Sequence, residues 1–153
     1  MKTFWKENCI RILLLTLLSL LFILWGRTVI KEMRHANKTE NLGTVAARLA
    51  CLKEYGWEAS AASEIKETIA IPSFFGQNFD RSNQLQKACG FDLERYRGEK
   101  AQYYTYEALN FPYETKSPVY IHLLIVNDTL IGGDCSLEDA DSFLLPLDKR
   151  FLP

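Results

Sequence analysis

Residues 119–135, which read VYIHLLIVNDTLIGGDC, constrain the fold more than any other stretch of this chain. Two apolar runs rich in β-branched residues flank Asn127-Asp128, and Asn and Asp tolerate the left-handed backbone that tight turns require. The pattern therefore predicts a β-hairpin closed by a two-residue loop. The expected cross-strand pairs are Val126 with Thr129, Ile125 with Leu130, Leu123 with Gly132 and His122 with Gly133.

Alternation along the hairpin divides its side chains between two faces of a sheet. The first face carries Val119, Ile121, Leu123, Ile125 and Leu130. The second face carries Tyr120, His122, Leu124, Val126, Thr129 and Ile131. Because Gly132 has no side chain, we expect a helix to approach the sheet closely over Leu123.

The N-terminal part of the chain contains an apolar run at residues 12–25, interrupted only by Thr16 and Ser19. With its apolar flanks the run approaches the ~20 residues that a membrane-spanning helix needs. Arg11 and Arg27 lie near its ends, where basic side chains can reach the lipid headgroups. The alternative is a cleaved signal peptide, but the small residues that cleavage requires are missing around residues 24–27. An uncleaved anchor is therefore favoured.

This anchor predicts a single-pass protein that contacts the lipid bilayer through its N-terminal helix. Lys2, Lys6 and Arg11 precede the run against one acid, Glu7, so the N-terminus should lie in the cytoplasm and the rest outside the cell. The expected divisions are a cytoplasmic N-terminus at 1–9, a transmembrane anchor at 10–30, a stalk at 31–40 and an extracytoplasmic domain at 41–153.

The domain itself mixes helical and strand-like patterns. Helical spacing predicts one helix that ends at Gly56 and a second that runs from an N-cap at Ser73 to Gly90. Residues 64–71 and 100–110 alternate as strands ahead of the hairpin. This order predicts an α+β fold in which two helices pack on one face of an antiparallel sheet of about four to five strands.

Charge and cysteine content exclude several classes of protein. The formal net charge is −1, from 18 basic and 19 acidic residues, so the charge favours no nucleic-acid partner. Cys51, Cys89 and Cys135 fit no metal-ligand spacing. One disulfide can form among them in an oxidising compartment, although small buried hydrophobic side chains are the favoured interpretation. We expect neither a metal nor a cofactor.

The residues that could support catalysis are few. His35 lies in the predicted stalk, which leaves His122 as the one histidine of the folded part. The predicted register places His122 and Asp134 on opposite faces of the sheet, so they should not form a reactive pair. An acidic cluster follows Gly133, but its spacing is not that of a calcium-binding loop and favours a solvated loop. Its members are Asp134, Glu138, Asp139 and Asp141. We therefore expect no catalytic residues and a domain that is not an enzyme.

Five phrases in the domain resemble one protein family. They are GWEA at 56–59, IP at 71–72, QKACGFDLERYRG at 86–98, YTYEALNFP at 104–112 and LLIVNDTLIGGDCS at 123–136. Together they are similar to the bacterial domain of unknown function family 4830. The resemblance implies a small protein of Gram-positive, clostridia-like bacteria with one N-terminal membrane helix. That family has no assigned activity, so the resemblance implies no catalytic residues. Residues 120–122 depart from its pattern, in which small or amide residues are more usual.

The second face of the hairpin offers the candidate binding surface, which consists of Tyr120, Leu124, Val126 and Ile131. An apolar patch of this size rarely faces water in a monomer. Either a partner docks on it or the tail folds back over it, and the tail is favoured because it needs no second molecule. The apolar tail residues are Phe143, Leu144, Leu145 and Leu147.

These observations predict a membrane-tethered extracytoplasmic binding or sensing module for an unknown extracytoplasmic protein or small ligand. One alternative is a small extracytoplasmic enzyme that uses His122 and Asp134. The other alternative is a structural component of an envelope complex.

Overall fold

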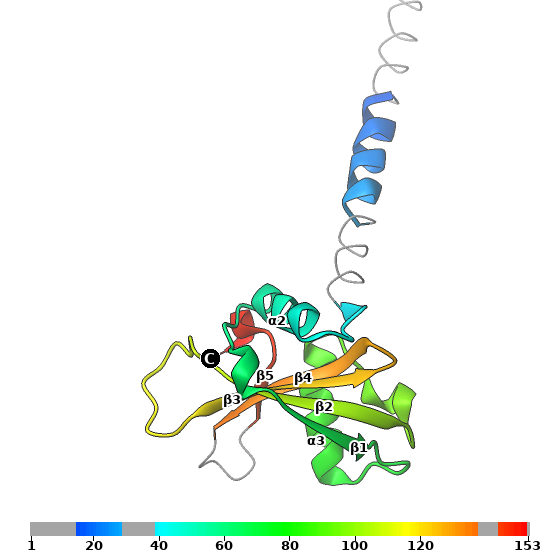
Figure 1. The fold of residues 1–153 in the computed structure, drawn as a ribbon. Coiled ribbons are helices and arrows are strands. Elements are labelled where there is room, and N and C mark those ends of the chain that lie inside the picture. Colours follow the sequence, from blue (N-terminus) through cyan, green and yellow to red (C-terminus); the bar gives the residue numbers. More distant parts are fainter. Residues whose placement is uncertain (1–14, 29–38, 138–143, 153) are drawn as a thin grey trace, which may run out of the picture. The chain divides into compact units, whose positions relative to one another are not determined.

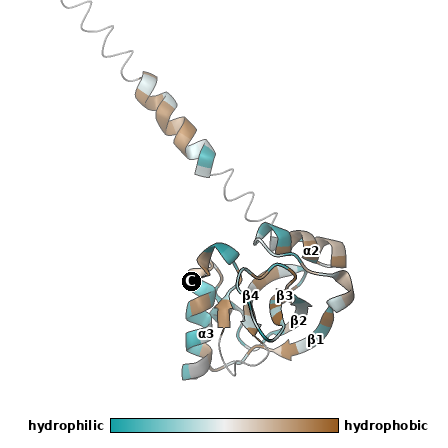
Figure 2. Ribbon diagram, turned by 90° about the vertical axis from the view of Figure 1, so that its left-hand side faces the viewer, coloured by the Kyte–Doolittle hydropathy of each residue, from teal (hydrophilic) through white to brown (hydrophobic). Residues whose placement is uncertain are grey.

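The computed structural model describes residues 15–28, 39–137 and 144–152 and forms two compact units, Met1–Asn37 and Lys38–Pro153. In the first unit residues 15–28 form a helix whose apolar side chains are exposed, among them Leu18, Phe22 and Trp25. Figure 2 shows hydrophobic residues along most of this helix. Within the described ranges, no helix combines the length and the apolarity of a membrane span. The anchor predicted at 10–30 and the stalk at 31–40 extend outside the described residues.

The second unit contains a five-stranded antiparallel sheet in which strand order follows chain order (Figure 1). Its strands are β1 (Ile65–Ala70), β2 (Lys100–Glu107), β3 (Val119–Val126), β4 (Thr129–Leu137) and β5 (Leu144–Pro146). Each strand pairs antiparallel with the next. The predicted α+β class, the hairpin and the strands near 64–71 and 100–110 are therefore confirmed. The short edge strand β5 was not predicted from the sequence.

The hairpin turn has the predicted two-residue loop, with Asn127 at φ 49° and Asp128 at φ 59°. The two pairs nearest the turn are confirmed, but the register shifts between Leu124 and Ile125. Ile131 is the extra residue of a β-bulge, so the pairs beyond it are Leu124 with Gly132, Leu123 with Gly133 and His122 with Asp134. The predicted pairs Leu123–Gly132 and His122–Gly133 are wrong, because one inserted residue moves every later side chain of β4 to the other face.

Helix α2 (Val45–Glu54) covers the first face of the sheet. The Thr44 side chain accepts a hydrogen bond from the Ala47 N–H at its start. At its end Gly56, with φ 90°, adopts the left-handed conformation, and the Trp57 N–H donates to the Leu52 carbonyl at 3.0 Å. This Schellman cap confirms the predicted helix end at Gly56. The first-face core contains Leu52, Trp57, Tyr104, Tyr106, Ile121, Leu123, Cys135 and Leu147.

The second face has its own hydrophobic core, built by the chain between β1 and β2. It contains Ile71, Phe75, Leu93, Ala101, Leu124, Val126 and Ile131. Helix α3 (Gln77–Ala88) contacts β4 and β5, and its Phe79 packs on this core, whereas Cys89 just beyond the helix packs on the first-face core. Figure 1 shows α2 on one side of the strands and α3 extending past them toward the other. The prediction that both helices pack on one face is wrong, because the second face is equally apolar and also has to be covered.

The start of α3 and the position of the tail also differ from the predictions. Helix α3 begins at an N-cap at Gly76 and not at Ser73. The described part of the tail, 144–152, packs on the first face instead of the second: Leu145 and Leu147 are buried in the first-face core, and the Trp57 Nε1–H donates to the Leu147 carbonyl at 2.5 Å. Phe143 lies outside the described residues. Three 3-10 turns complete the unit: η1 (Ala61–Ser63), η2 (Leu93–Tyr96) and η3 (Lys149–Phe151).

No disulfide joins Cys51, Cys89 and Cys135 in the described part of the chain. Cys51 and Cys135 are buried in the first-face core, and Cys89 is half-buried beside it. They therefore act as small apolar side chains, as the sequence favours.

Candidate ligand-binding site

A cavity of about 140 Å³ lies on the second face of the sheet, between the strands and helix α3. Its apolar wall includes Ile69, Ile71, Phe79, Leu93 and Leu124. Its polar lining consists of Ser82, Gln86, Tyr103 and Asp134. Strands β1, β2, β3 and β4 and helix α3 all contribute, so the cavity exists only once the whole second face is assembled. No lysine, arginine or histidine is among its described lining residues.

Strand β4 lines the cavity with Gly133 and Asp134, the residues that lie just beyond its bulge. The Gly133 N–H donates to Gln86 Oε1 at 2.8 Å, which fixes the buried Gln86 side chain against the strand. Gly132 leaves the space for this contact, because a Cβ atom there would lie 3.0 Å from Gln86 Oε1 and from a Leu93 methyl. A helix does approach a glycine closely, as the sequence predicts, but over Leu124 instead of Leu123.

The turn η2 closes the same face next to α3. The Leu93 N–H donates to the buried Asn83 Oδ1 at 2.9 Å, and Asn83 Nδ2 donates to Asp92 at 3.3 Å. These bonds hold the loop after α3 against the helix, which keeps the Leu93 side chain over the sheet.

Asp134 is the acidic group of the cavity. Its Oδ1 atom is buried and has no hydrogen-bond partner among the residues that the structure describes. Burial raises the pKa of Asp134 to about 7. Burial also raises the pKa of Tyr103, and the nearby Asp134 charge adds to that effect. A carboxyl group left without a donor is costly in a folded protein and is a recognised mark of functional sites.

His122 lies beside Asp134 as its cross-strand partner, on the same face of the sheet. The prediction that the two residues point to opposite faces is therefore wrong, and the bulge is the reason. The His122 ring nitrogens are used elsewhere, with Nδ1 3.0 Å from the Thr105 hydroxyl and Nε2 2.9 Å from the Ser136 hydroxyl. The ring also stacks on Tyr103 with 5.0 Å between centroids. Burial lowers the pKa of His122 to about 4, so the ring is neutral at pH 7.

The candidate surface of Tyr120, Leu124, Val126 and Ile131 is not an open surface. Leu124, Val126 and Ile131 are 8%, 8% and 2% exposed, and Tyr120 is half-buried. Residues from the segment 71–99, among them Ile71, Phe75 and Leu93, cover this face instead of the tail. Leu124 alone of the four is among the residues that line the cavity.

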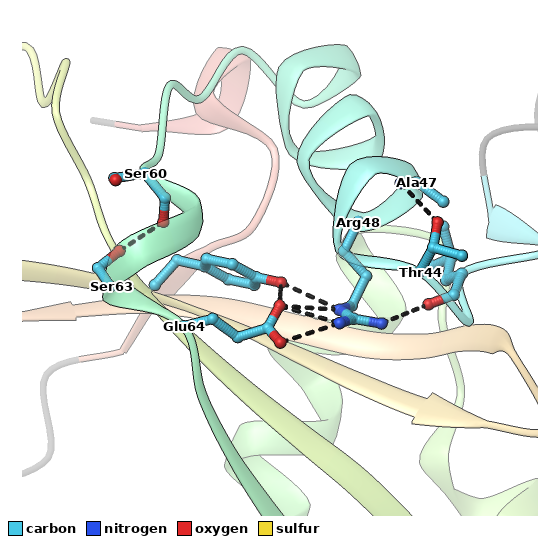
Figure 3. A network of polar contacts seen from close by, with 8 residues as sticks. Thr44, Ala47, Arg48, Ser60, Ser63 and Glu64 are labelled. Carbon is cyan, nitrogen blue, oxygen red and sulfur yellow. Dashed lines mark hydrogen bonds and ion pairs between the residues drawn. The ribbon is translucent and has the colours of Figure 1, made fainter.

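A second polar cluster lies on the first face and was missed by the sequence reasoning (Figure 3). The Arg48 guanidinium, contributed by α2, donates to both carboxylate oxygens of Glu64 at 2.9–3.0 Å and to the Tyr106 hydroxyl at 3.0 Å. Its third nitrogen donates to the Leu42 carbonyl at 2.8 Å, and the group stacks 3.9 Å from the Tyr104 ring centroid.

This cluster is satisfied within the protein. Burial alone would lower the pKa of Arg48, but the hydrogen bonds to Tyr106 and Glu64 outweigh it and raise the pKa. The Tyr106 hydroxyl in turn donates to Glu64. Every charged group of the cluster thus has a partner, and the cluster joins α2, the start of β1 and β2. It is a structural clamp.

The remaining candidate residues from the sequence add nothing to the described site. Glu138, Asp139 and Asp141 of the acidic cluster lie outside the described residues, as does His35. Among the described residues no group of three or more His, Cys, Asp or Glu side chains is arranged to hold a metal ion.

Comparison with known proteins places the chain in a family. A family model described as Domain of unknown function (DUF4830) matches residues 51–135, which include α2 from Cys51 onward, β1 to β3 and the bulged part of β4. The chain belongs to this family, as the resemblance of its five phrases indicated. No curated protein and no solved structure matches the chain.

Proposed function

We propose that this protein is a membrane-tethered extracytoplasmic module that binds a small ligand in the cavity on the second face of its sheet. The observation that carries this proposal is the buried Asp134 oxygen without a donor, in the wall of a mostly apolar cavity. Ligand sites combine apolar walls with a few placed polar groups in this way.

The tether is supported by residues 15–28. This helix exposes nearly all of its large apolar side chains, which are costly to leave in water. Its sequence continues as an apolar run toward residue 12, and basic residues precede it. A bilayer would remove these side chains from water, and the basic flank supports a location of the domain outside the cell.

Binding is favoured over catalysis by the state of His122. The pairing with Asp134 brings two groups of shifted pKa side by side, as an enzyme would need. However, the two ring nitrogens already contact Thr105 and Ser136, and the ring is absent from the cavity lining. A general base needs a free nitrogen within reach of its substrate, so a binding role fits the geometry better.

The tether can be tested by tagging each end of the full chain and treating intact cells with protease. A C-terminal tag should be removed and an N-terminal tag should survive. Protection of the C-terminal tag would overturn the external location. Release of the domain into the medium, beginning near Arg27, would indicate a cleaved signal peptide instead.

The binding role can be tested with the full chain in lipid nanodiscs and a set of fragments of about six to ten heavy atoms, a size suited to the cavity. Fragments should shift the methyl signals of Leu124 and Ile71 but not those of Leu123. Ser82→Trp, which fills the cavity from α3, should abolish the shifts. Gln84→Trp on the exposed side of the same helix should not. Shifts that survive Ser82→Trp, or none with any fragment, would contradict a ligand site here.

A further inference from the structure

The described lining of the cavity contains one acidic side chain, that of Asp134, and no basic side chain. The Gln86 oxygen already accepts a hydrogen bond from the Gly133 N–H. The Asp134 oxygen therefore lacks both a hydrogen-bond donor and a counter-charge within the described structure.

We propose that the cavity binds an alkylammonium group, whose apolar chain fills the space between α3 and the sheet while its nitrogen donates to Asp134. This inference rests on the proposed function, since it names the ligand class of the same site. An ammonium supplies at once the donor and the positive charge that the carboxylate lacks. A neutral alcohol supplies only the donor, and a carboxylic acid anion would be repelled.

Two further features fit a cation. Phe79 and Tyr103 line the cavity, and aromatic faces attract an ammonium group. The volume of about 140 Å³ matches a short chain. For comparison, an apolar cavity of about 150 Å³ holds one benzene molecule. The chain of n-pentylamine, or the side chain of lysine, is of this size.

The test uses the full chain in nanodiscs and three matched probes: n-pentylamine, n-pentanol and pentanoate. At pH 8 the amine should bind at least about tenfold more tightly than the alcohol, measured by the methyl shifts of Leu124 and Ile71, and the anion should not bind. At pH 5 the amine is still charged, but protonation of Asp134 should weaken its binding about tenfold. Binding of the alcohol should not change.

Asp134→Asn should remove the preference for the amine and its pH dependence while leaving the alcohol bound. Asp80→Asn, which removes an exposed charge from the same helix that lines the cavity, should preserve both. Comparing n-pentylamine with Nα-acetyl-lysine methylamide would separate two sources of the group. Tighter binding of the amine indicates a free small amine, and tighter binding of the lysine derivative indicates a peptide side chain.

The outcomes separate the two proposals. Equal binding of amine and alcohol, or a preference for the amine that survives Asp134→Asn, would overturn the cation assignment and leave the cavity as a ligand site. Failure of all three probes to bind would overturn both.

Discussion

The two faces of the sheet each hold a partly buried acidic side chain, Glu64 on the first face and Asp134 on the second, in different surroundings. Glu64 accepts three hydrogen bonds from Arg48 and one from Tyr106. Asp134 has an oxygen with no donor in the described structure, and its pKa is raised to about 7. The acidic group with a full set of partners lies on the first face, and the one with an unpartnered oxygen lines the cavity on the second face. This difference is what leads us to propose a structural role for Glu64 and a binding role for Asp134.

The largest expected effect comes from breaking the satisfied cluster. Arg48→Met should lower the free energy of unfolding by about 3–5 kcal/mol, because it leaves the Glu64 carboxylate and Tyr106 without their donor. The value should lie at the lower end, since the Glu64 side chain is 17% exposed and can draw in water. Urea unfolding of residues 38–153 can be followed by Trp57, the one tryptophan of that unit. Lys53→Met, at an exposed position of α2, is the control and should change little. A loss below about 1 kcal/mol for Arg48→Met would mean that the cluster is not a clamp.

The incomplete face should show itself in the pH dependence of stability. The pKa of Asp134 in the folded state, about 7, exceeds its ordinary value of 3.8. Between these values the folded state binds more protons than the unfolded state, so stability falls as pH rises from 4 to 7. Asp134→Asn removes this loss. The free energy of unfolding of this variant should equal that of the unmodified chain at pH 4. At pH 8 it should be larger by roughly 2–4 kcal/mol.

His122 should oppose this effect within the same pH range. Its pKa in the folded state, about 4, is below its ordinary value of 6.5, so the unfolded state binds more protons and stability rises from pH 4 to 6.5. The two slopes partly cancel in the unmodified chain. His122→Gln should therefore expose a steeper fall of stability with pH, whereas Asp134→Asn should expose a rise. Parallel pH curves for all three chains would show that neither group is buried as described.

The features that were predicted correctly depend only on residues close together in the sequence. Alternation identified β1, β2 and the hairpin, Asn127-Asp128 identified the turn, and Gly56 and Gly90 identified the helix ends, where Schellman bonds form. The assignment of β3 side chains to two faces is also correct, because it needs only the period of a strand.

The remaining features depend on contacts between distant segments. The bulge at Ile131 gives no local signal, and it is accompanied by the hydrogen bond between Gly133 and Gln86, 47 residues away. The cavity and the Asp134–His122 pairing follow from that bulge. A charged residue such as Arg48 is expected at the protein surface when only the sequence is known. It is buried because Glu64 and Tyr106 lie where they can accept its hydrogen bonds. A signal was present in part, since Arg48 lies between Ala47 and Leu49, which also pack on the first-face core.

Substitutions at the adjacent glycines Gly132 and Gly133 test how tightly each face of the sheet is packed. A Cβ at Gly133 would lie 2.6 Å from the His122 carbonyl oxygen and 2.8 Å from a Leu147 methyl, and the carbonyl cannot move without the strand. A Cβ at Gly132 would meet only side-chain atoms of Gln86 and Leu93, at 3.0 Å. Gly133→Ala should cost about 2–3 kcal/mol and Gly132→Ala about 1 kcal/mol. Gly132→Leu should cost about 1–3 kcal/mol, through crowding of Gln86 and not of Leu123.

Urea unfolding of the same unit measures these costs. The reverse order, with Gly132→Ala the more damaging, would contradict the register beyond the bulge. A matched loss in both variants would mean that the two faces are equally tightly packed, and the cavity would then have no special status.

The smallest expected effect concerns how the two helices begin. Thr44 caps α2 with its side chain, whereas Gly76 begins α3 without a side-chain hydrogen bond. The backbone of Gly76, at φ −91° and ψ 174°, suits any residue, and a Cβ there meets nothing within 4 Å. Gly76→Ser should therefore stabilise the unit by about 0.5–1 kcal/mol, by capping the Phe79 N–H and by restricting the unfolded chain.

Two further variants separate these causes and locate the helix start. Gly76→Ala gains the restriction of the unfolded chain but no cap, so it should fall about 0.5–1 kcal/mol below Gly76→Ser. Ser73→Ala should change nothing if α3 begins at Gly76, but it should destabilise by about 1 kcal/mol if Ser73 were the N-cap. A Ser73 effect together with a neutral Gly76→Ser would move the start of α3 and bring additional helix over the second face. The cavity lined by Pro72 and Phe79 would then have a different mouth, and fragment binding should change with it.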